Sequence, residues 1–182
     1  MSSSSPILWT TLADIGKADI PAAPIIGFIL SLLTRFINFA IITPPKVSNT
    51  KATSPSVWGK LYSKHSHNEL ASFGRGESFG MCYDVKDSKE INYMACYDVE
   101  DIAKAKEMGL KIVEVPAAEY AIIELKGPVP ESIHEGWKYA MEVFFPQHGY
   151  KHSGKPDFEY YYEGDIDSPD YKMELWIPIV KA

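Results

Sequence analysis

The sequence predicts an α+β domain in which one βαββ unit occurs twice and both copies join in a single antiparallel sheet. The composition of the 182 residues is that of a globular protein, with 46% hydrophobic and 23% charged residues. Short runs that read as strands lie in pairs around polar turns. A segment with the apolar spacing of a helix precedes each pair. Two such halves would place the helices on one face of the sheet and leave a central cleft for a ligand.

The first unit begins after an apolar leader. AIITPPKVS could hold a short strand, although its two consecutive prolines make it a poor one. SPSVWGKLYSKH reads as a helix, because Val57, Leu61 and Tyr62 repeat at helical spacing. ESFGMCYDV and INYMACYDV read as two strands around the turn KDSKE. VEDIAKAKEMG reads as one or two helical turns that end at Gly109.

The second unit repeats this order. LKIVEVP and AEYAIIELKG read as a strand that is broken at Pro116. ESIHEGWKYAMEVFFPQHG reads as the second helix, with Trp137 in its apolar stripe. PDFEYYYEG and YKMELWIPIV read as a closing hairpin around an acidic turn.

Residues 1–45 differ in composition from the rest, and we interpret them as an apolar leader that precedes a ligand-binding domain at 46–182. The apolar run 20–42 is about long enough to cross a bilayer, but Arg35 and Asn38 interrupt it and are costly at mid-membrane. It could be a helix packed on the body or on a partner, a membrane anchor, or an irregular segment. No basic region or cleavage site marks a signal peptide. We expect a cytoplasmic protein, with membrane association through the apolar run as the alternative.

The charge of the chain favours a cationic ligand. Lys and Arg number 18 and Asp and Glu number 24, so the formal net charge is −6 and nucleic acid is a poor partner. Cys82 and Cys96 lie in strand-like runs and read as small buried residues of a reducing compartment. KHSHNE reads as a solvated loop with too few convergent ligands for a metal site, and no phosphate-binding or dinucleotide-binding motif occurs. We expect neither a metal nor a cofactor, and a homodimer is one option for the assembly.

Four segments together resemble the GyrI-like small-molecule-binding family: VPAAEYAIIELKG, the Trp137 helix, PDFEYYYEG and YKMELWIPI. SVWGKLYSK and SFGMCYDV match it more loosely. The family includes the effector-binding domains of AraC- and MerR-type multidrug transcription regulators and stand-alone modules carried on integron cassettes. The resemblance covers about residues 50–180. It implies two SH2-like βαββ halves around an aromatic cleft that binds bulky lipophilic, often cationic, compounds.

The resemblance also implies which residues line the cleft. Glu159 matches the glutamate that faces the cleft in the multidrug regulators, and Tyr171 matches an aromatic residue at the start of the last strand. Phe79 stands where a cleft tyrosine is expected. Alternation along a strand places Tyr161 on the same face as Glu159. The other candidates for ligand contact are Met81, Tyr93, Trp137 and Glu174.

Each candidate also has a structural interpretation. Glu159 could point to water from an edge strand, and Glu174 could form a surface ion pair. The remaining candidates could be core residues: Phe79, Met81, Tyr93 and Trp137. If Glu159 does face an apolar groove, it loses hydration and its pKa should rise. A lipophilic cation would then supply a partner charge, while rings hold it by stacking and cation–π contacts.

Such a cleft is compatible with three functions. The first is a stand-alone binding module for bulky lipophilic cations. The second is hydrolysis of strained electrophiles such as cyclopropyl-type alkylators, with Glu159 activating water and Tyr171 donating a proton. The third is an interaction module that binds a partner's surface, as gyrase inhibitors of this family do. The sequence does not separate binding from catalysis, because the same cleft serves both.

Overall fold

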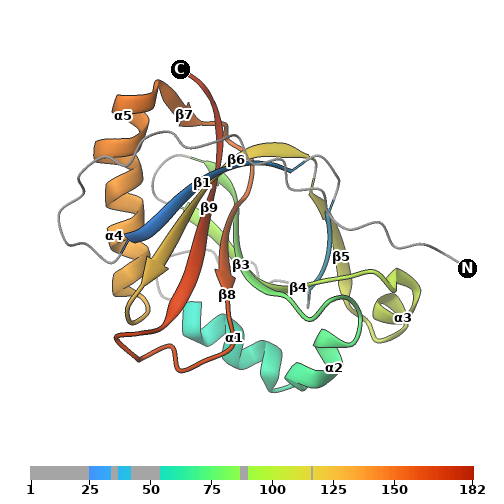
Figure 1. The fold of residues 1–182 in the computed structure, drawn as a ribbon. Helices are drawn as coiled ribbons and strands as arrows, with labels where there is room; N and C mark the ends of the chain where they lie inside the picture. Colours follow the sequence, from blue (N-terminus) through green and yellow to red (C-terminus); the bar gives the residue numbers. More distant parts are fainter. Residues whose placement is uncertain (1–24, 34–36, 42–53, 87–89, 116) are drawn as a thin grey trace, which may run out of the picture.

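A single sheet organises the protein (Figure 1). The computed structural model describes residues 25–33, 37–41, 54–86, 90–115 and 117–182. The strands are β1 (Ile25–Leu33), β2 (Ile37–Ile41), β3 (Ser78–Lys86), β4 (Glu90–Asp98), β5 (Lys111–Val115), β6 (Ala118–Lys126), β7 (Tyr150–His152), β8 (Asp157–Tyr161) and β9 (Lys172–Lys181). They lie in the order β1-β6-β9-β8-β3-β4-β2-β5, and β7 pairs with β9. All these pairs are antiparallel.

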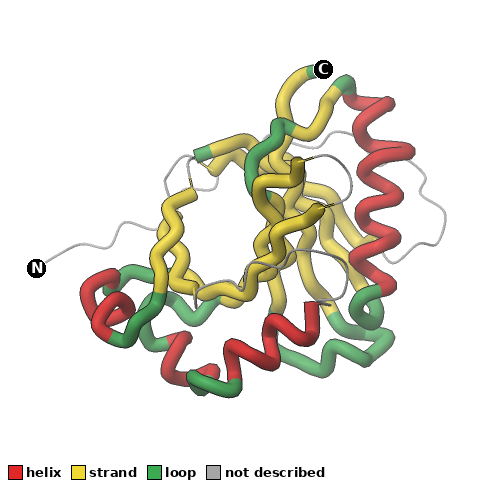
Figure 2. The backbone as a smooth tube through the Cα atoms, turned by 180° about the vertical axis from the view of Figure 1, so that it is seen from behind, coloured by secondary structure: helices red, strands yellow, loops and turns green. Residues whose placement is uncertain are grey.

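The helices lie outside the curve of the sheet, as both views show (Figures 1 and 2). They are α1 (Ser54–Tyr62), α2 (His67–Ala71), α3 (Ile102–Glu107), α4 (Glu131–Tyr139) and α5 (Phe145–His148), and a π-helical turn, η1 (Ala140–Phe144), joins the last two. The α+β fold with a mostly antiparallel sheet is therefore confirmed. The equivalence of two βαββ halves stays a prediction.

Strand alternation divides the apolar side chains between the two faces of the sheet. On the outer face, α4 and its extension cover a core cluster that includes Ile123, Leu125 and Leu175, and α1 and α2 cover a second one around Tyr97. The inner face carries a third core cluster, made mainly of Phe79, Met81, Tyr120, Ile122, Phe158 and Trp176. Each large side chain that is fully buried in this way stabilises the fold by roughly 1.5–3 kcal/mol.

The expectation of a helix in the apolar run 20–42 is wrong for the residues that the structure describes, because they form β1 and β2. β1 pairs with β6, and β2 lies between β4 and β5. A predominantly apolar run does not distinguish a strand from a helix by its periodicity, so distant pairing partners decided the outcome. Among the described residues no helix has the length and hydropathy needed to cross a membrane. The domain boundary after residue 45 stays a prediction, although it separates these two strands from the rest of the sheet.

The segment KHSHNE is a loop only as far as Ser66, because α2 begins at His67. Ser66 caps this short helix, since its hydroxyl oxygen accepts a hydrogen bond from the backbone N–H of Glu69 at 3.2 Å. The buried Leu70, which is 1% exposed, then anchors α2 on the sheet. This placement brings His67 to the rim of the cavity described next.

Candidate ligand-binding site

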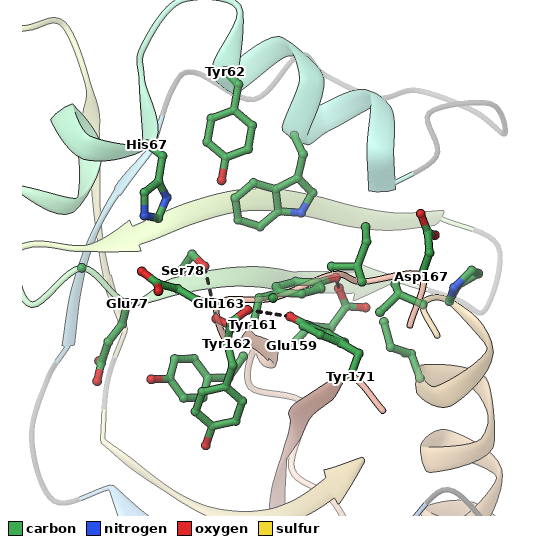
Figure 3. A pocket seen from close by; sticks show the side chains of 18 of the residues that line it. Tyr62, His67, Glu77, Ser78, Glu159, Tyr161, Tyr162, Glu163, Asp167 and Tyr171 are labelled. Carbon is green, nitrogen blue, oxygen red and sulfur yellow. Dashed lines mark hydrogen bonds between the residues drawn. The ribbon is translucent and has the colours of Figure 1, made fainter. Parts of the chain in front are cut away.

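A cavity of about 1160 Å³ lies between α1, the start of α4 and the ends of β3 and β8 (Figure 3). Its aromatic lining residues are Trp58, Tyr62, Tyr160, Tyr161, Tyr162 and Tyr171. Its acidic lining residues are Glu77, Glu159, Glu163 and Asp167. Pockets for drug-sized ligands usually span about 300–1,000 Å³, so this cavity has room for a bulky molecule.

Glu159 lies in the wall of this cavity, on β8. Its Oε2 atom accepts hydrogen bonds from the hydroxyl of Tyr161 at 2.6 Å and from the hydroxyl of Tyr93 at 2.9 Å. Burial raises the pKa of the Glu159 carboxyl above its ordinary value, and the two hydroxyls oppose that rise. The neighbouring Asp157 also raises this pKa, while His134 lowers it. A carboxylate with few water contacts would gain a great deal from a positive charge placed beside it.

Trp58 connects helix α1 to the same wall. Its indole N–H donates to the hydroxyl oxygen of Tyr93 at 3.1 Å, and its ring meets that of Tyr161 edge to face, with the centroids 5.6 Å apart. The same indole stacks on Tyr62 with a centroid distance of 5.7 Å. We did not single out Trp58 from the sequence. The sequence feature that could have identified it is the aromatic pair Trp58 and Tyr62, because residues four apart lie on one face of a helix.

The structure brings three of the predicted residues together in the cavity wall: Glu159, Tyr161 and Tyr171. Tyr93 lies behind that wall, with its hydroxyl on Glu159. The hydroxyl of Tyr171 donates to the carbonyl oxygen of Tyr162 at 2.8 Å, and burial raises its pKa to about 12. A proton donor beside Glu159 would therefore be Tyr161 or Tyr93 rather than Tyr171.

Phe79 and Met81 lie on the other face of the sheet. They are 1% and 0% exposed and belong to the inner-face core. Gly80, the residue between them, is the one opposite Glu159 in the ladder between β3 and β8. Because side chains alternate along a strand, both neighbours of Gly80 point away from the cavity.

Trp137 and Glu174 also lie outside the lining of this cavity, as far as the described residues define it. Trp137 belongs to α4 and packs against the outer-face core. The two oxygens of Glu174 accept hydrogen bonds from the hydroxyl of Tyr162 at 2.5 Å and from the indole N–H of Trp176 at 2.6 Å. The core packing of Trp137 fits its structural interpretation, whereas these two partners of Glu174 are neutral donors rather than the cation of a surface ion pair.

A short loop from Phe73 to Glu77 supplies the far rim of the cavity, and the sequence did not indicate that this loop lies there. Asp98, at the end of β4 and only 3% exposed, accepts the backbone N–H groups of Arg75 at 2.7 Å and Glu77 at 2.8 Å. The guanidinium of Arg75 forms ion pairs with Glu77 at 2.5 Å and with Asp98 at 3.4 Å. Asp98 thus fixes the loop that carries Arg75.

We find no cluster of three or more potential metal ligands in the described parts of the chain. Cys82 and Cys96 are free thiols, and burial raises the pKa of both.

Proteins with similar folds or sequences include one with a known ligand. A structure described as SAV2435 bound to tetraphenylphosphonium has a TM-score of 0.68 and 18% identity, and the alignment covers 85% of this chain and 94% of that one. The integron cassette protein VCH_CASS2 from Vibrio cholerae has a TM-score of 0.60 and 16% identity, with coverage of 86% and 97%. At such identities the likeness shows the fold.

A sequence relative is a regulator. The transcriptional regulator BrlR of Pseudomonas aeruginosa is 28% identical over 127 residues, which are 66% of this chain and 46% of BrlR. This chain thus spans less than half the length of that regulator. The family described as GyrI-like small molecule binding domain matches residues 34–180, most of the described sheet and all of the cavity. The chain therefore belongs to the GyrI-like small-molecule-binding family.

Proposed function

We propose that this chain binds bulky lipophilic cations in the cavity around Glu159. The observation that carries the proposal is the setting of this carboxylate, whose Oε2 atom is held by two tyrosine hydroxyls in a wall of aromatic rings. Burial has removed much of the water that would otherwise solvate its charge. A cation that enters the cavity supplies a counter-charge without requiring hydration of its own.

The other charges of the lining favour the same class of ligand. Among the described residues, four carboxylates line the cavity, and the single guanidinium in that lining, that of Arg75, is already paired with Glu77. Aromatic rings such as those of Trp58 and Tyr161 add cation–π attraction of about 0.5–2 kcal/mol each when the contact is desolvated. The potential inside the cavity therefore attracts cations, and the rings provide a flat apolar surface for the rest of the ligand.

The relatives support this assignment. The similarly folded SAV2435 was solved with tetraphenylphosphonium, which is a bulky lipophilic cation. The match to BrlR suggests a place for such a module in transcription regulation, where it would bind an effector. We propose that this chain has an effector-binding or sequestering role.

The test is a calorimetric titration of wild type and Glu159→Gln with tetraphenylphosphonium and with the neutral triphenylphosphine oxide. Glutamine keeps the shape of the side chain, so the fold should persist. Binding of the cation should weaken by roughly 1–3 kcal/mol, the usual scale for a charged contact out of water, and binding of the neutral compound should weaken much less. Glu135→Gln, on the exposed side of α4, is the matched control. Equal losses for the two compounds would refute the proposal.

Hydrolysis of strained electrophiles stays an alternative prediction for the same cavity. Glu159 has hydroxyl donors within 2.6 Å and 2.9 Å, which resembles the surroundings of a residue that positions water. A cyclopropyl-type electrophile incubated with the protein would distinguish the two functions. Product formation that exceeds the rate with Glu159→Gln favours the hydrolase, whereas ligand recovered unchanged favours binding alone.

A further inference from the structure

Gly80 leaves the space that the Tyr93 hydroxyl needs in order to reach Glu159. The two strands place Gly80 directly opposite Glu159. A Cβ atom at position 80 would overlap the Tyr93 hydroxyl and would lie 2.5 Å from Oε2 of Glu159. Glycine within a strand weakens it and often marks such a close approach. The hydrogen bond between Tyr93 and Glu159 therefore depends on the missing side chain at position 80.

The direction of the hydrogen bonds follows from the chemistry of the three groups. An indole N–H can only donate, so the Tyr93 oxygen accepts from Trp58. The hydroxyl proton of Tyr93 is donated to Oε2 of Glu159. Tyr161 donates to the same oxygen. Two O–H donors on one oxygen favour the ionised carboxylate over the neutral acid, because hydrogen bonds to a charged acceptor are the stronger ones.

We propose that Tyr93 is a specificity-determining residue of the cation site, because its hydroxyl positions Glu159 as a charged partner for the ligand. Trp58 donates a hydrogen bond to this hydroxyl, and the missing side chain of Gly80 leaves the space for it. This inference rests on the proposed function. Tyr93 is a positioning residue, because it acts through Glu159 from behind the cavity wall. It also joins helix α1 to the carboxylate, since Trp58 belongs to α1.

Other titratable groups face Glu159 from the surrounding elements. On β8 these are Asp157 and Tyr161, on β3 Cys82, on β4 Tyr93, and on α4 His134. Of this set, only His134 adds positive charge when it is protonated. Burial raises the pKa of Glu159, and the Tyr93 hydroxyl is one of the groups that lower it. Removing this hydroxyl should therefore make Glu159 protonate at a higher pH.

The experiment measures the affinity for tetraphenylphosphonium and triphenylphosphine oxide as a function of pH, for wild type, Tyr93→Phe and Tyr120→Phe. Tyr120 is the control, because its hydroxyl donates to the carbonyl oxygen of Pro156 at 3.0 Å and its ring lies in the inner-face core. In Tyr93→Phe the affinity for the cation near neutral pH should fall roughly tenfold to hundredfold, as expected for the loss of one hydrogen bond to a charged group. The midpoint of the pH dependence should move to higher pH, and binding of the neutral compound should change less than about twofold.

A second variant disturbs the hydrogen bond between Tyr93 and Glu159 without removing the hydroxyl. Gly80→Ala keeps the Tyr93 hydroxyl but displaces it from Glu159, so its pH midpoint should move in the same direction. An unchanged midpoint in Tyr93→Phe, or equal losses for the two compounds, would overturn the inference. Glu159→Gln distinguishes a failure of the proposed function from a failure of the role proposed for Tyr93. If Glu159→Gln selectively impairs cation binding and Tyr93→Phe does not, the proposed cation site is supported and only the proposed role of Tyr93 is refuted.

Discussion

Asp98 should be among the most sensitive single positions for the stability of the cavity rim. Its side chain is 3% exposed and receives two backbone N–H groups, those of Arg75 and Glu77, together with the Arg75 guanidinium at 3.4 Å. Asparagine has nearly the same shape but only one carbonyl oxygen. In Asp98→Asn, whichever way the amide is turned, its NH₂ group faces one of the two backbone N–H groups and leaves that donor unsatisfied.

The expected cost follows from these contacts. A buried donor without an acceptor costs about 1–3 kcal/mol, and hydrogen bonds to a charged group are each worth about 1.5–3 kcal/mol. Since asparagine retains one of the bonds in neutral form, we expect Asp98→Asn to lower the free energy of unfolding by roughly 2–4 kcal/mol. For a chain of this size that corresponds to a fall in Tm of about 5–15 °C. Thermal melts followed by circular dichroism and urea titrations both measure it.

Asp101→Asn is the matched control for this experiment. Asp101 is exposed and caps α3, where its carboxylate accepts the backbone N–H of Lys104 at 3.0 Å. Asparagine is as good an N-cap as aspartate, so the stability should change by less than about 0.5 kcal/mol. If the two variants melt within about 2 °C of each other, Asp98 does not hold the loop in the way that the contacts indicate.

Three further predictions concern the carboxylate and the amino-terminal strands. Cation binding by the wild type should weaken as the pH falls through the raised pKa of Glu159, because the protonated carboxyl offers no charge; an affinity that stays constant from neutral to acid pH would contradict this. A raised pKa also means that the folded state binds this proton more tightly than the unfolded state, so ionised Glu159 lowers stability once the pH exceeds that pKa. Glu159→Gln should therefore keep or raise the wild-type Tm at neutral pH while it loses cation affinity, and the gain should vanish in acid; a large drop in Tm at neutral pH would count against a buried charge. Finally, deletion of residues 1–24 keeps every described strand, whereas deletion of residues 1–45 removes β1 and β2 and should lower the Tm. Equal melts of the two deletion variants would instead favour a domain boundary at residue 46.

Local pattern was enough to predict the elements that contribute most to the cavity wall. The closing hairpin and the long helix after β6 were predicted from alternation and helical spacing, and they correspond to β8, β9 and α4. Alternation also put Glu159 and Tyr161 on one face, which is where the structure has them. Such features follow from the sequence because the period of a strand or a helix is a property of a few consecutive residues.

Only the tertiary structure decided which face was open and what surrounds the carboxylate. Phe79 and Met81 were reasonable candidates by residue type, yet strand pairing places them in the inner-face core. The apolar run before residue 45 became strands because β6, β4 and β5 were available as partners. Tyr93, which holds Glu159, is 66 residues away from it in the chain. A hydrogen bond over that distance requires two strands, a glycine gap and a helix to be in place together, and no local period of the sequence encodes their joint position.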